Sequence, residues 1–254
     1  MARQVTIAVI GKGRLGSSIA GAIRNERRKY KLFAHPAARS KSFNMLRRNG
    51  GPDVLFIVCK DKYISDVART ALLTCGANTK IIAHCAGALS SEILPKRKGI
   101  SRLMLHPIQT FTKSDPNAFS GITFGAESKD NKALQFAYKF IGAIGANEII
   151  LLKPKQLPLY HAMIVLGANF ITLLGAAVEE LSDALKIPSK KIKKALAPLM
   201  KRSLDNVLAN DAADVLTGPL ARRDFETIRK HKKALSNTSS QELYNAFVKF
   251  AEKL

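Results

Sequence analysis

The sequence predicts an α/β fold, in which a doubly wound, parallel sheet is followed by a smaller all-helical domain. Short runs of apolar and β-branched residues alternate with helix-like segments through the first part of the chain, and a glycine-rich turn joins the first run to a helix. Such alternation is typical of parallel strands joined by right-handed crossover helices. No convincing strand follows residue 153, so we expect domains at residues 1–153 and 154–254.

The strands of the first domain are predicted from continuous apolar runs, which are typical of strands covered by helices on both faces. The runs lie at residues 5–10, 30–35, 54–59, 80–84 and 102–106. A further unit extends the same architecture, with a strand over 121–127, a helix around 132–145 and a strand over 148–152.

Prolines divide the second domain into predicted helices, which lie near residues 158–186, 189–209, 219–235 and 239–253. The stretch Leu157–Val178 contains no Asp, Glu, Lys or Arg and is long enough to cross a bilayer. Because His161 and Asn169 lie within it and polar groups are costly against lipid, we expect a helix buried in protein and no membrane span.

The composition is strongly basic, with 41 Lys and Arg against 19 Asp and Glu and a formal net charge of +22. Such charge attracts polyanions non-specifically. However, the lysine-rich runs at 190–194 and 229–233 contain no aromatic residues, and no nucleic-acid motif is present. We therefore expect solvated helix faces rather than a nucleic-acid site.

The three cysteines, Cys59, Cys75 and Cys85, form no CxxC pair. This pattern fits neither a disulfide framework nor a zinc knuckle, so no metal site is predicted. The first residues have no apolar stretch followed by a cleavage site, which excludes a secretory signal and makes a reducing, cytoplasmic location the expectation.

The glycine-rich turn reads GKGRLG, with Gly11, Gly13 and Gly16 directly after the first strand and Arg14 and Leu15 opening the first helix. Gly11 permits the tight turn, Gly13 lets the backbone approach a pyrophosphate, and Gly16 allows the helix to pack closely on the strand. The helix N-terminus adds a positive dipole. The alternative is a plain strand-to-helix turn; the pattern favours a bound dinucleotide.

The residues after the second strand favour NADP over NAD. NAD sites usually carry an Asp or Glu there for the ribose hydroxyl, but residues 27–52 contain no carboxylate. Arg39 and Lys41 could pair with a 2′-phosphate, and Ser40 could donate a hydrogen bond to it. The alternative is that the two cations only face solvent.

Ligands of open α/β sheets bind beyond the carboxyl ends of the strands, so polar residues at those ends are candidate site residues. Lys60, His84, His106 and Gln109 hold such positions. An imidazole there can exchange a proton near neutral pH, which favours His106 as a catalytic residue. The alternative is that its ring only caps the loop backbone.

The apolar helix carries Tyr160 and His161 near its start and Asn169 two turns later. Buried polar groups need partners, which could be a substrate or other side chains. We assign His161 or His106 as the proton donor, and Asn169 and Gln109 as residues that orient a substrate oxygen.

Taken together, GKGRLG, HCAGALSSE, HPIQTF, YHAMIVLGANF and LTGPLARRD resemble a family of proposed NADP oxidoreductases with a Rossmann fold and a C-terminal domain of unknown function 2520. The resemblance covers essentially the whole chain. It implies a nicotinamide-binding domain followed by a helical domain similar to those of 6-phosphogluconate dehydrogenase, ketopantoate reductase and pyrroline-carboxylate reductase. It supplies no substrate.

The resemblance also marks individual positions: His106, Gln109, Thr110, Tyr160, His161, Asn169, Thr217, Gly218, Pro219, Arg222 and Asp224. Three positions depart from the pattern. Ala86 replaces a serine, Arg223 replaces the glycine of TGPxxRGD, and Val165 stands where similar dehydrogenases carry a lysine four residues before the asparagine.

These observations predict an NADP-dependent oxidoreductase that moves a hydride between nicotinamide and a small carbonyl or imine compound. The missing lysine and Ala86 keep open an alternative, a sensor that binds NADP without turnover. A homodimer is also expected, because the long uncharged helix needs more cover than the short helices of its own domain provide. The Ala, Gly and Leu residues Gly167, Ala168, Leu174, Gly175 and Ala176 would allow close helix contact.

Overall fold

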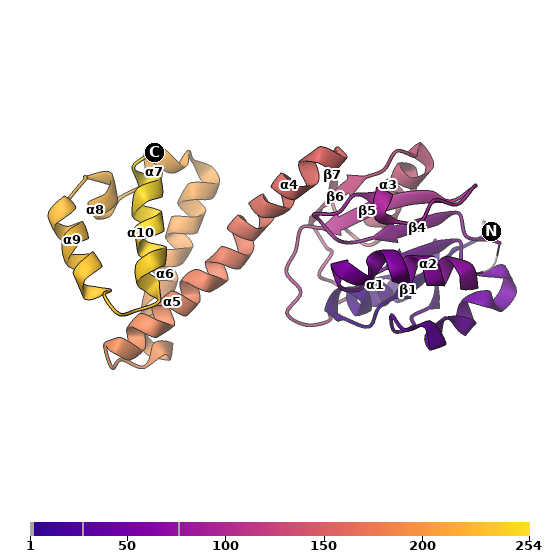
Figure 1. Ribbon diagram of the computed structural model, residues 1–254, viewed down its shortest axis with the longest axis horizontal. Coiled ribbons are helices and arrows are strands. Elements are labelled where there is room, and N and C mark those ends of the chain that lie inside the picture. The colour runs from indigo at the N-terminus through magenta and orange to yellow at the C-terminus, as the bar shows by residue number, and fades with distance from the viewer. Residues whose placement is uncertain (1–2, 27, 76) are drawn as a thin grey trace. The chain divides into compact units, whose positions relative to one another are not determined.

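The computed structural model describes residues 3–26, 28–75 and 77–254, without the side chains of residues 40–42. Within this part of the chain seven strands form a single sheet in the order β2-β1-β3-β4-β5-β6-β7 (Figure 1). The strands are β1 (Val5–Ile10), β2 (Tyr30–Ala34), β3 (Val54–Ile57), β4 (Ile81–His84), β5 (Ser101–Pro107), β6 (Thr123–Glu127) and β7 (Glu148–Leu151). Every run predicted as a strand forms one.

The strands are parallel except at one junction, where β6 runs antiparallel to β5. Residues 108–122 join these two strands and contain no helix. A parallel return requires a crossover connection, and without a helix to provide it the chain turns back beside β5. The expectation that this unit continues the parallel pattern is therefore wrong at β5–β6, although β7 is again parallel to β6.

Helices cover both faces of the sheet, as a doubly wound fold requires. Alternate residues of β1 point to opposite faces: Ile7 and Val9 pack with α1 (Arg14–Asn25) and α3 (Asn131–Ala143), whereas Ala8 and Ile10 belong to the other core. That second core includes η1 (Ser40–Gly50) and α2 (Ile64–Thr74). Further short turns are η2 (Asp61–Tyr63), η3 (Ser91–Ile93) and η4 (Pro154–Gln156).

The chain divides into two compact units, residues 1–165 and 166–254. The expected boundary at 153/154 lies before α4 (Leu157–Ile164), whereas the observed division follows this helix. The reason is packing: the side chain of Leu157 is fully buried and that of Tyr160 is 5% exposed, and Tyr160 reaches the sheet strand β6 at Gly125. The start of the apolar segment thus belongs to the first unit.

The second unit is entirely helical in the described residues. A π-helical turn, η5 (Val165–Asn169), spans the division between the units, and the second unit then contains α5 (Phe170–Ala184), α6 (Ser189–Ala209), α7 (Ala212–Val215), α8 (Gly218–Ala221), α9 (Phe225–Ala234) and α10 (Ser240–Ala251). The carboxylate of Glu180 on α5 accepts hydrogen bonds from the backbone amides of Ser239 and Ser240, at 2.6 and 3.0 Å. These bonds satisfy free amides at the start of α10.

The helix predicted over residues 219–235 is interrupted. The backbone of Arg223 has φ 53°, in the left-handed region, so α8 ends before it and α9 starts after it. Asp224 caps α9, because its carboxylate accepts hydrogen bonds from the amide and hydroxyl of Thr227, at 3.0 and 2.8 Å. These bonds hold the pKa of Asp224 below its ordinary value.

The apolar segment Pro154–Ala184 is long and apolar enough to cross a membrane, by length and composition only, and an 18-residue window within it has a mean hydropathy of 1.8. The sequence predicts burial in protein, but the chain itself leaves large apolar side chains of this segment exposed. The exposed side chains include Leu159 (78%), Met163 (56%), Leu166 (60%) and Leu173 (55%). A single copy of the chain therefore does not bury this helix.

Candidate active site

The turn between β1 and α1 requires two of its three glycines for packing. Gly11 has φ 128°, and a Cβ added there would lie 1.9 Å from the carbonyl oxygen of Val58. A Cβ at Gly16 would lie 2.2 Å from the carbonyl oxygen of Gly11. At Gly13, by contrast, an added Cβ would meet nothing within 4 Å. The backbone at Gly13 therefore faces open space that a ligand could approach closely.

The start of α1 fits an anionic group. Gly13 is the N-cap residue and gives no side-chain hydrogen bond, and no acidic residue lies in the first turn. The first amides of a helix have no partner within the helix, and they carry the positive end of its dipole. The side chain of Leu15 packs on the core, while the Arg14 guanidinium is exposed and donates to the Phe111 carbonyl oxygen at 3.4 Å. A pyrophosphate would meet free amides here.

The loop after β2 holds the glycine turn in place. His35 donates from Nε2 to the Gly11 carbonyl oxygen at 2.8 Å, and the Gly11 amide donates to the Pro36 carbonyl oxygen at 2.9 Å. Burial lowers the pKa of His35. Arg39 follows in the same loop and is exposed, so its guanidinium is available to a ligand. The side chains of Ser40 and Lys41 lie outside the described part of the structure.

Two further predicted cofactor residues differ in their surroundings. Lys60 follows β3 and is exposed. His84 is fully buried, and both of its ring nitrogens are occupied: the Ala86 amide donates to Nδ1 and Nε2 donates to the Ser90 carbonyl oxygen, each at 3.2 Å. Burial lowers the pKa of His84 to about 4. A direct bond from its side chain to a cofactor would require the His84–Ser90 loop to rearrange.

His106, Tyr160 and His161 lie together, although the first is far from the other two in the sequence. His106 lies near the end of β5, and its Nδ1 is 3.0 Å from the hydroxyl of Tyr160 on α4. The rings of His106 and His161 meet edge to face, with centroids 5.9 Å apart. The fold thus brings the two predicted catalytic imidazoles into contact and adds a phenol to them.

Burial sets the protonation of two members of this cluster, His106 and Tyr160. It lowers the pKa of His106 to about 4, with a smaller contribution in the same direction from His161 and His84. Burial raises the pKa of Tyr160 to about 12, and a hydrogen bond with the Gly125 backbone acts in the opposite direction. Near neutral pH His106 is therefore uncharged and the Tyr160 phenol is protonated.

Two glycines make room for the cluster. A Cβ added at Gly87 would lie 2.8 Å from Cδ2 of His161 and 3.0 Å from Cε1 of His106. A Cβ added at Gly125 would lie 2.3 Å from the Tyr160 hydroxyl. Larger residues at either position would displace the side chains that form the cluster.

A buried carboxylate fixes the loop that carries Gly87. Glu127, only 2% exposed, accepts hydrogen bonds from the Ser91 amide at 2.6 Å and from the hydroxyls of Ser90 and Ser91 at 3.0 and 3.3 Å. The carbonyl of Ser90 is the acceptor for His84. Glu127 therefore anchors the His84–Ser91 loop beside the cluster.

The remaining predicted site residues are not part of this cluster. Gln109 is exposed, and its Oε1 accepts a hydrogen bond from the Thr110 amide at 2.8 Å. Asn169 is exposed and belongs to the second unit. Thr217, Gly218, Pro219, Arg222 and Asp224 also belong to that unit, where they form α8 and the turn into α9.

The sequence-based assignment of the site omits Gly87 and Glu127, and it marks Tyr160 without giving it a role. Tyr160 is visible in the sequence as a polar residue next to His161 in an apolar helix, and the HCAGALSSE motif contains Gly87. Glu127 has no such signal. A carboxylate that ends an apolar strand looks like an ordinary surface residue until the fold buries it.

Three solved structures illustrate the similarity of the fold. The structure of a proposed NADP oxidoreductase from Bacteroides fragilis has a TM-score of 0.80 at 19% identity and covers 99% of both chains. A protein from Thermotoga maritima has a TM-score of 0.71 at 23% identity and covers 98% of this chain and 97% of its own. The pyrroline carboxylate reductase of Plasmodium falciparum, solved with NADP bound, has a TM-score of 0.60 at 13% identity and covers 97% of this chain and 98% of its own.

A comparison with curated proteins finds no match. The solved structures share so little sequence with this chain that they support the Rossmann-like fold alone. The family itself is shown by a model of the sequence family called Domain of unknown function (DUF2520), which matches residues 122–250. This match covers half of the chain, including β6, β7 and all of the helical unit except its last residues. The chain belongs to the DUF2520 family.

Proposed function

We propose that the protein is an NADP-dependent oxidoreductase that transfers a hydride between nicotinamide and a small carbonyl or imine compound. The observation that carries the proposal is the turn between β1 and α1. Gly11 and Gly16 are packed against backbone carbonyls, Gly13 faces open space, and the helix begins without a side-chain cap. This arrangement suits a dinucleotide pyrophosphate.

The choice of NADP rests on charge after β2. Residues 27–52 contain no carboxylate that could accept the ribose hydroxyls of NAD. Arg39 is exposed in the loop after β2, the same loop that holds the Gly11 turn, and its guanidinium can pair with a 2′-phosphate. The pyrroline carboxylate reductase with the similar fold was solved with NADP, which is consistent with this choice.

When bound, the cofactor supplies or accepts the hydride. The chain has to hold the substrate and to move one proton. We assign the proton to His161, which is half-buried beside Gly87 and touches the ring of His106. The uncharged ring of His106 is suited to donate a hydrogen bond to a substrate oxygen or nitrogen rather than a proton.

Tyr160 orients His106 in this scheme. We propose that its protonated phenol donates a hydrogen bond to Nδ1 of His106, 3.0 Å away. An imidazole that accepts a bond at Nδ1 carries its own hydrogen on Nε2. With this bond formed, the N–H at Nε2 of His106 is the donor that we assign to the substrate.

Turnover tests the proposal. The protein should be screened with ketoacids and imines while the loss of NADPH absorbance is followed. For a substrate identified in this way, His161→Asn should lower kcat by about 100-fold or more, the range expected for a general acid. The matched control is His231→Asn in the helical unit, where the native ring pairs with Tyr244 instead. Full turnover after replacement of both His106 and His161 would overturn the assignment.

We further propose that a second copy of the chain covers the exposed apolar side chains of the Pro154–Ala184 segment. Leu166 and Leu173 are 60% and 55% exposed within one copy. A Cβ added at Gly167 or Gly175 would meet nothing within 4 Å, so another helix has room to approach there. His161 and Asn169, in the same segment, would be costly against lipid, which favours protein as the cover.

Light scattering at micromolar concentration tests the dimer. Leu166→Glu and Leu173→Glu should each convert the dimer to a monomer, because a buried, unpaired charge is strongly unfavourable. Leu199→Glu on α6 is the matched control, since Leu199 is 63% exposed and lies outside the segment. A monomeric unmodified protein, or one that floats with liposomes, would contradict this proposal.

A further inference from the structure

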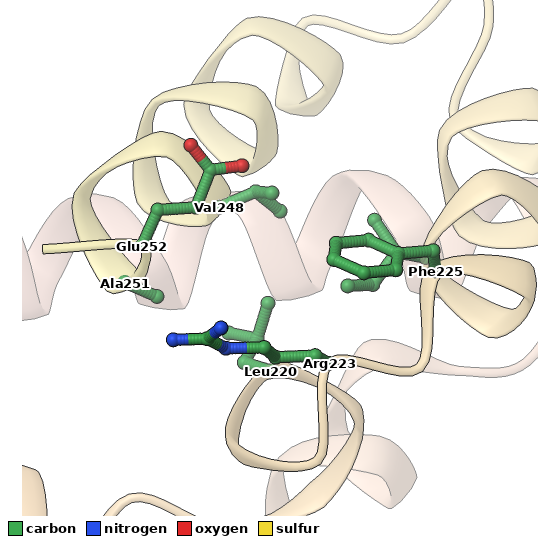
Figure 2. Close-up of a pocket in the computed structure, with 7 residues that line it drawn as sticks. Leu220, Arg223, Phe225, Val248, Ala251 and Glu252 are labelled. Atoms are coloured by element: carbon green, nitrogen blue, oxygen red, sulfur yellow. The ribbon is translucent and has the colours of Figure 1, made fainter. Parts of the chain in front are cut away.

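The helical unit contains a cavity of about 210 Å³ between the turn from α8 to α9 and the end of α10 (Figure 2). Five apolar residues form much of its lining, Leu220, Phe225, Ile228, Val248 and Ala251. Ile228 and Val248 are only 7% and 6% exposed, so they form a true apolar floor rather than a rim. All of these residues belong to the second unit.

Two side chains of opposite charge, Arg223 and Glu252, complete the lining. The guanidinium of Arg223 extends from the turn toward the end of α10 that carries Ala251, while the Glu252 carboxylate lies near Val248 (Figure 2). Within the described residues, neither side chain makes a hydrogen bond or an ion pair. Both charges are therefore available to a ligand.

The backbone at Arg223 holds an unfavourable conformation. Its φ of 53° lies in the left-handed region that non-glycine residues rarely adopt. Hydrogen bonds from the Arg223 amide to Leu220 and from the Phe225 amide to Arg223, at 3.2 and 2.9 Å, keep it there. Strain of this kind is typical of functional positions, where a particular side chain is needed despite its cost. Here the side chain in question lines the cavity.

We propose that this cavity binds a small α-amino acid with an aliphatic side chain. The guanidinium of Arg223 pairs with the carboxylate of the ligand, the Glu252 carboxylate with its ammonium group, and Ile228 and Val248 contact its side chain. A cavity of about 150 Å³ with apolar walls is enough for benzene, so a branched aliphatic side chain fits a volume of about 210 Å³. The proposal does not depend on the proposed oxidoreductase activity.

Three matched probes separate the contributions of the two charges. L-Leucine carries both charged groups, 4-methylpentanoate lacks the ammonium group, and 3-methylbutylamine lacks the carboxylate. Each is titrated into the full chain labelled with ¹⁵N, and amide shifts are followed at fixed ionic strength. Leucine should bind saturably with shifts concentrated at residues 220–228 and 248–252, and each truncated probe should bind about tenfold more weakly or worse.

Variants identify the groups involved. Arg223→Gly should weaken leucine binding about tenfold, so that leucine no longer binds more tightly than 3-methylbutylamine. In Glu252→Gln, leucine should no longer bind more tightly than 4-methylpentanoate. Arg222→Ala, next in the chain and absent from the lining, is the control and should bind leucine as the unmodified protein does. The proposal is overturned if leucine gives no saturable shifts at tens of millimolar, if the shifts lie elsewhere, or if Arg223→Gly leaves binding unchanged.

Discussion

At the residue scale, the backbone conformation of Arg223 should reduce stability. Its φ of 53° costs a non-glycine residue about 1 kcal/mol relative to glycine. Arg223→Gly should therefore raise the free energy of unfolding of the helical unit by about 1 kcal/mol, a gain that the lost side-chain contacts reduce. Urea denaturation of the full chain at neutral pH measures this change.

The neighbouring residue provides the control for this prediction. Arg222 has φ −84°, which any residue adopts, so Arg222→Gly should bring no gain and should cost a few tenths of a kcal/mol through chain entropy. Equal effects of the two substitutions would show that Arg223 is not strained.

The contact between His106 and Tyr160 illustrates what a sequence leaves undecided at this scale. Each residue can be recognised by itself, His106 at a strand end and Tyr160 in an apolar helix. Their 3.0 Å contact depends on how α4 meets β6, because Tyr160 approaches so closely only where Gly125 lacks a side chain. Spacing along the chain carries no information about that packing, and the same holds for the burial of Glu127.

At the element scale, substitutions in the turn between β1 and α1 should affect either folding or cofactor binding, depending on the glycine that is replaced. Gly11→Ala and Gly16→Ala should destabilise the first unit by several kcal/mol, because the new methyl groups would lie 1.9 and 2.2 Å from backbone carbonyl oxygens. Gly13→Ala has no neighbour within 4 Å and should fold normally, but should bind NADPH about tenfold more weakly. Thermal unfolding and a fluorescence titration measure the two effects.

The same three substitutions also test the alternative that the glycines form a plain strand-to-helix turn without a bound dinucleotide. If the glycines served only the turn, Gly13→Ala would leave both stability and NADPH affinity unchanged. A normal affinity in a well-folded Gly13→Ala protein would therefore remove the main support for a pyrophosphate at this turn.

The helices show which features of an element sequence can predict. The bounds of α6, Ser189–Ala209, agree with the prediction over 189–209. Pro188 precedes the helix as expected, but Pro198 lies inside it and does not end it. The long apolar helix is also found, but with a π-helical turn at Val165–Asn169 and with its apolar side chains exposed. Apolar composition predicts that such a helix surface is buried. It does not show whether the rest of the chain or a second molecule buries it.

At the scale of the whole molecule, the buried His84 and the half-buried His106 should make the stability depend on pH. His84 and His106 have pKa values of about 4 in the folded chain, against about 6.5 when exposed. Between these values the unfolded chain binds more protons, so stability is complete above about pH 6.5 and is lost as the pH falls toward 4. His35, whose pKa burial also lowers, acts with the same sign.

Urea denaturation at two pH values tests this linkage. From about pH 7 to pH 5 the free energy of unfolding should fall by roughly 2 kcal/mol for each of His84 and His106. In His106→Asn the free energy of unfolding should fall by roughly 2 kcal/mol less over the same pH range. Stability that is unchanged between the two pH values would contradict the burial of these rings.

The topology was predictable in its main part because strand and helix signals alternate through residues 1–110 and right-handed crossovers leave few arrangements. The reversal at β6 was not, since an apolar run has the same appearance whether its strand is parallel or antiparallel. The position of the division between the units also depended on packing: Leu157 and Tyr160 tie the start of the apolar helix to the first unit.

The proposed function requires the first unit to bind NADP at the Gly11–Gly16 turn, with Arg39 at the 2′-phosphate. A guanidinium–phosphate bond contributes about 1.5–3 kcal/mol before solvent screening, which is about tenfold or more in affinity. Arg47→Ala is the matched control, since Arg47 is an exposed cation in η1.

The most direct measurement is a fluorescence titration of NADPH and NADH against the unmodified protein, Arg39→Ala and Arg47→Ala. Fixed, near-physiological ionic strength is essential, because a net charge of +22 attracts either dinucleotide at low salt. NADPH should bind at least about tenfold more tightly than NADH, and Arg39→Ala alone should remove this difference. Equal affinities for the two dinucleotides in the unmodified protein would contradict the assignment of NADP.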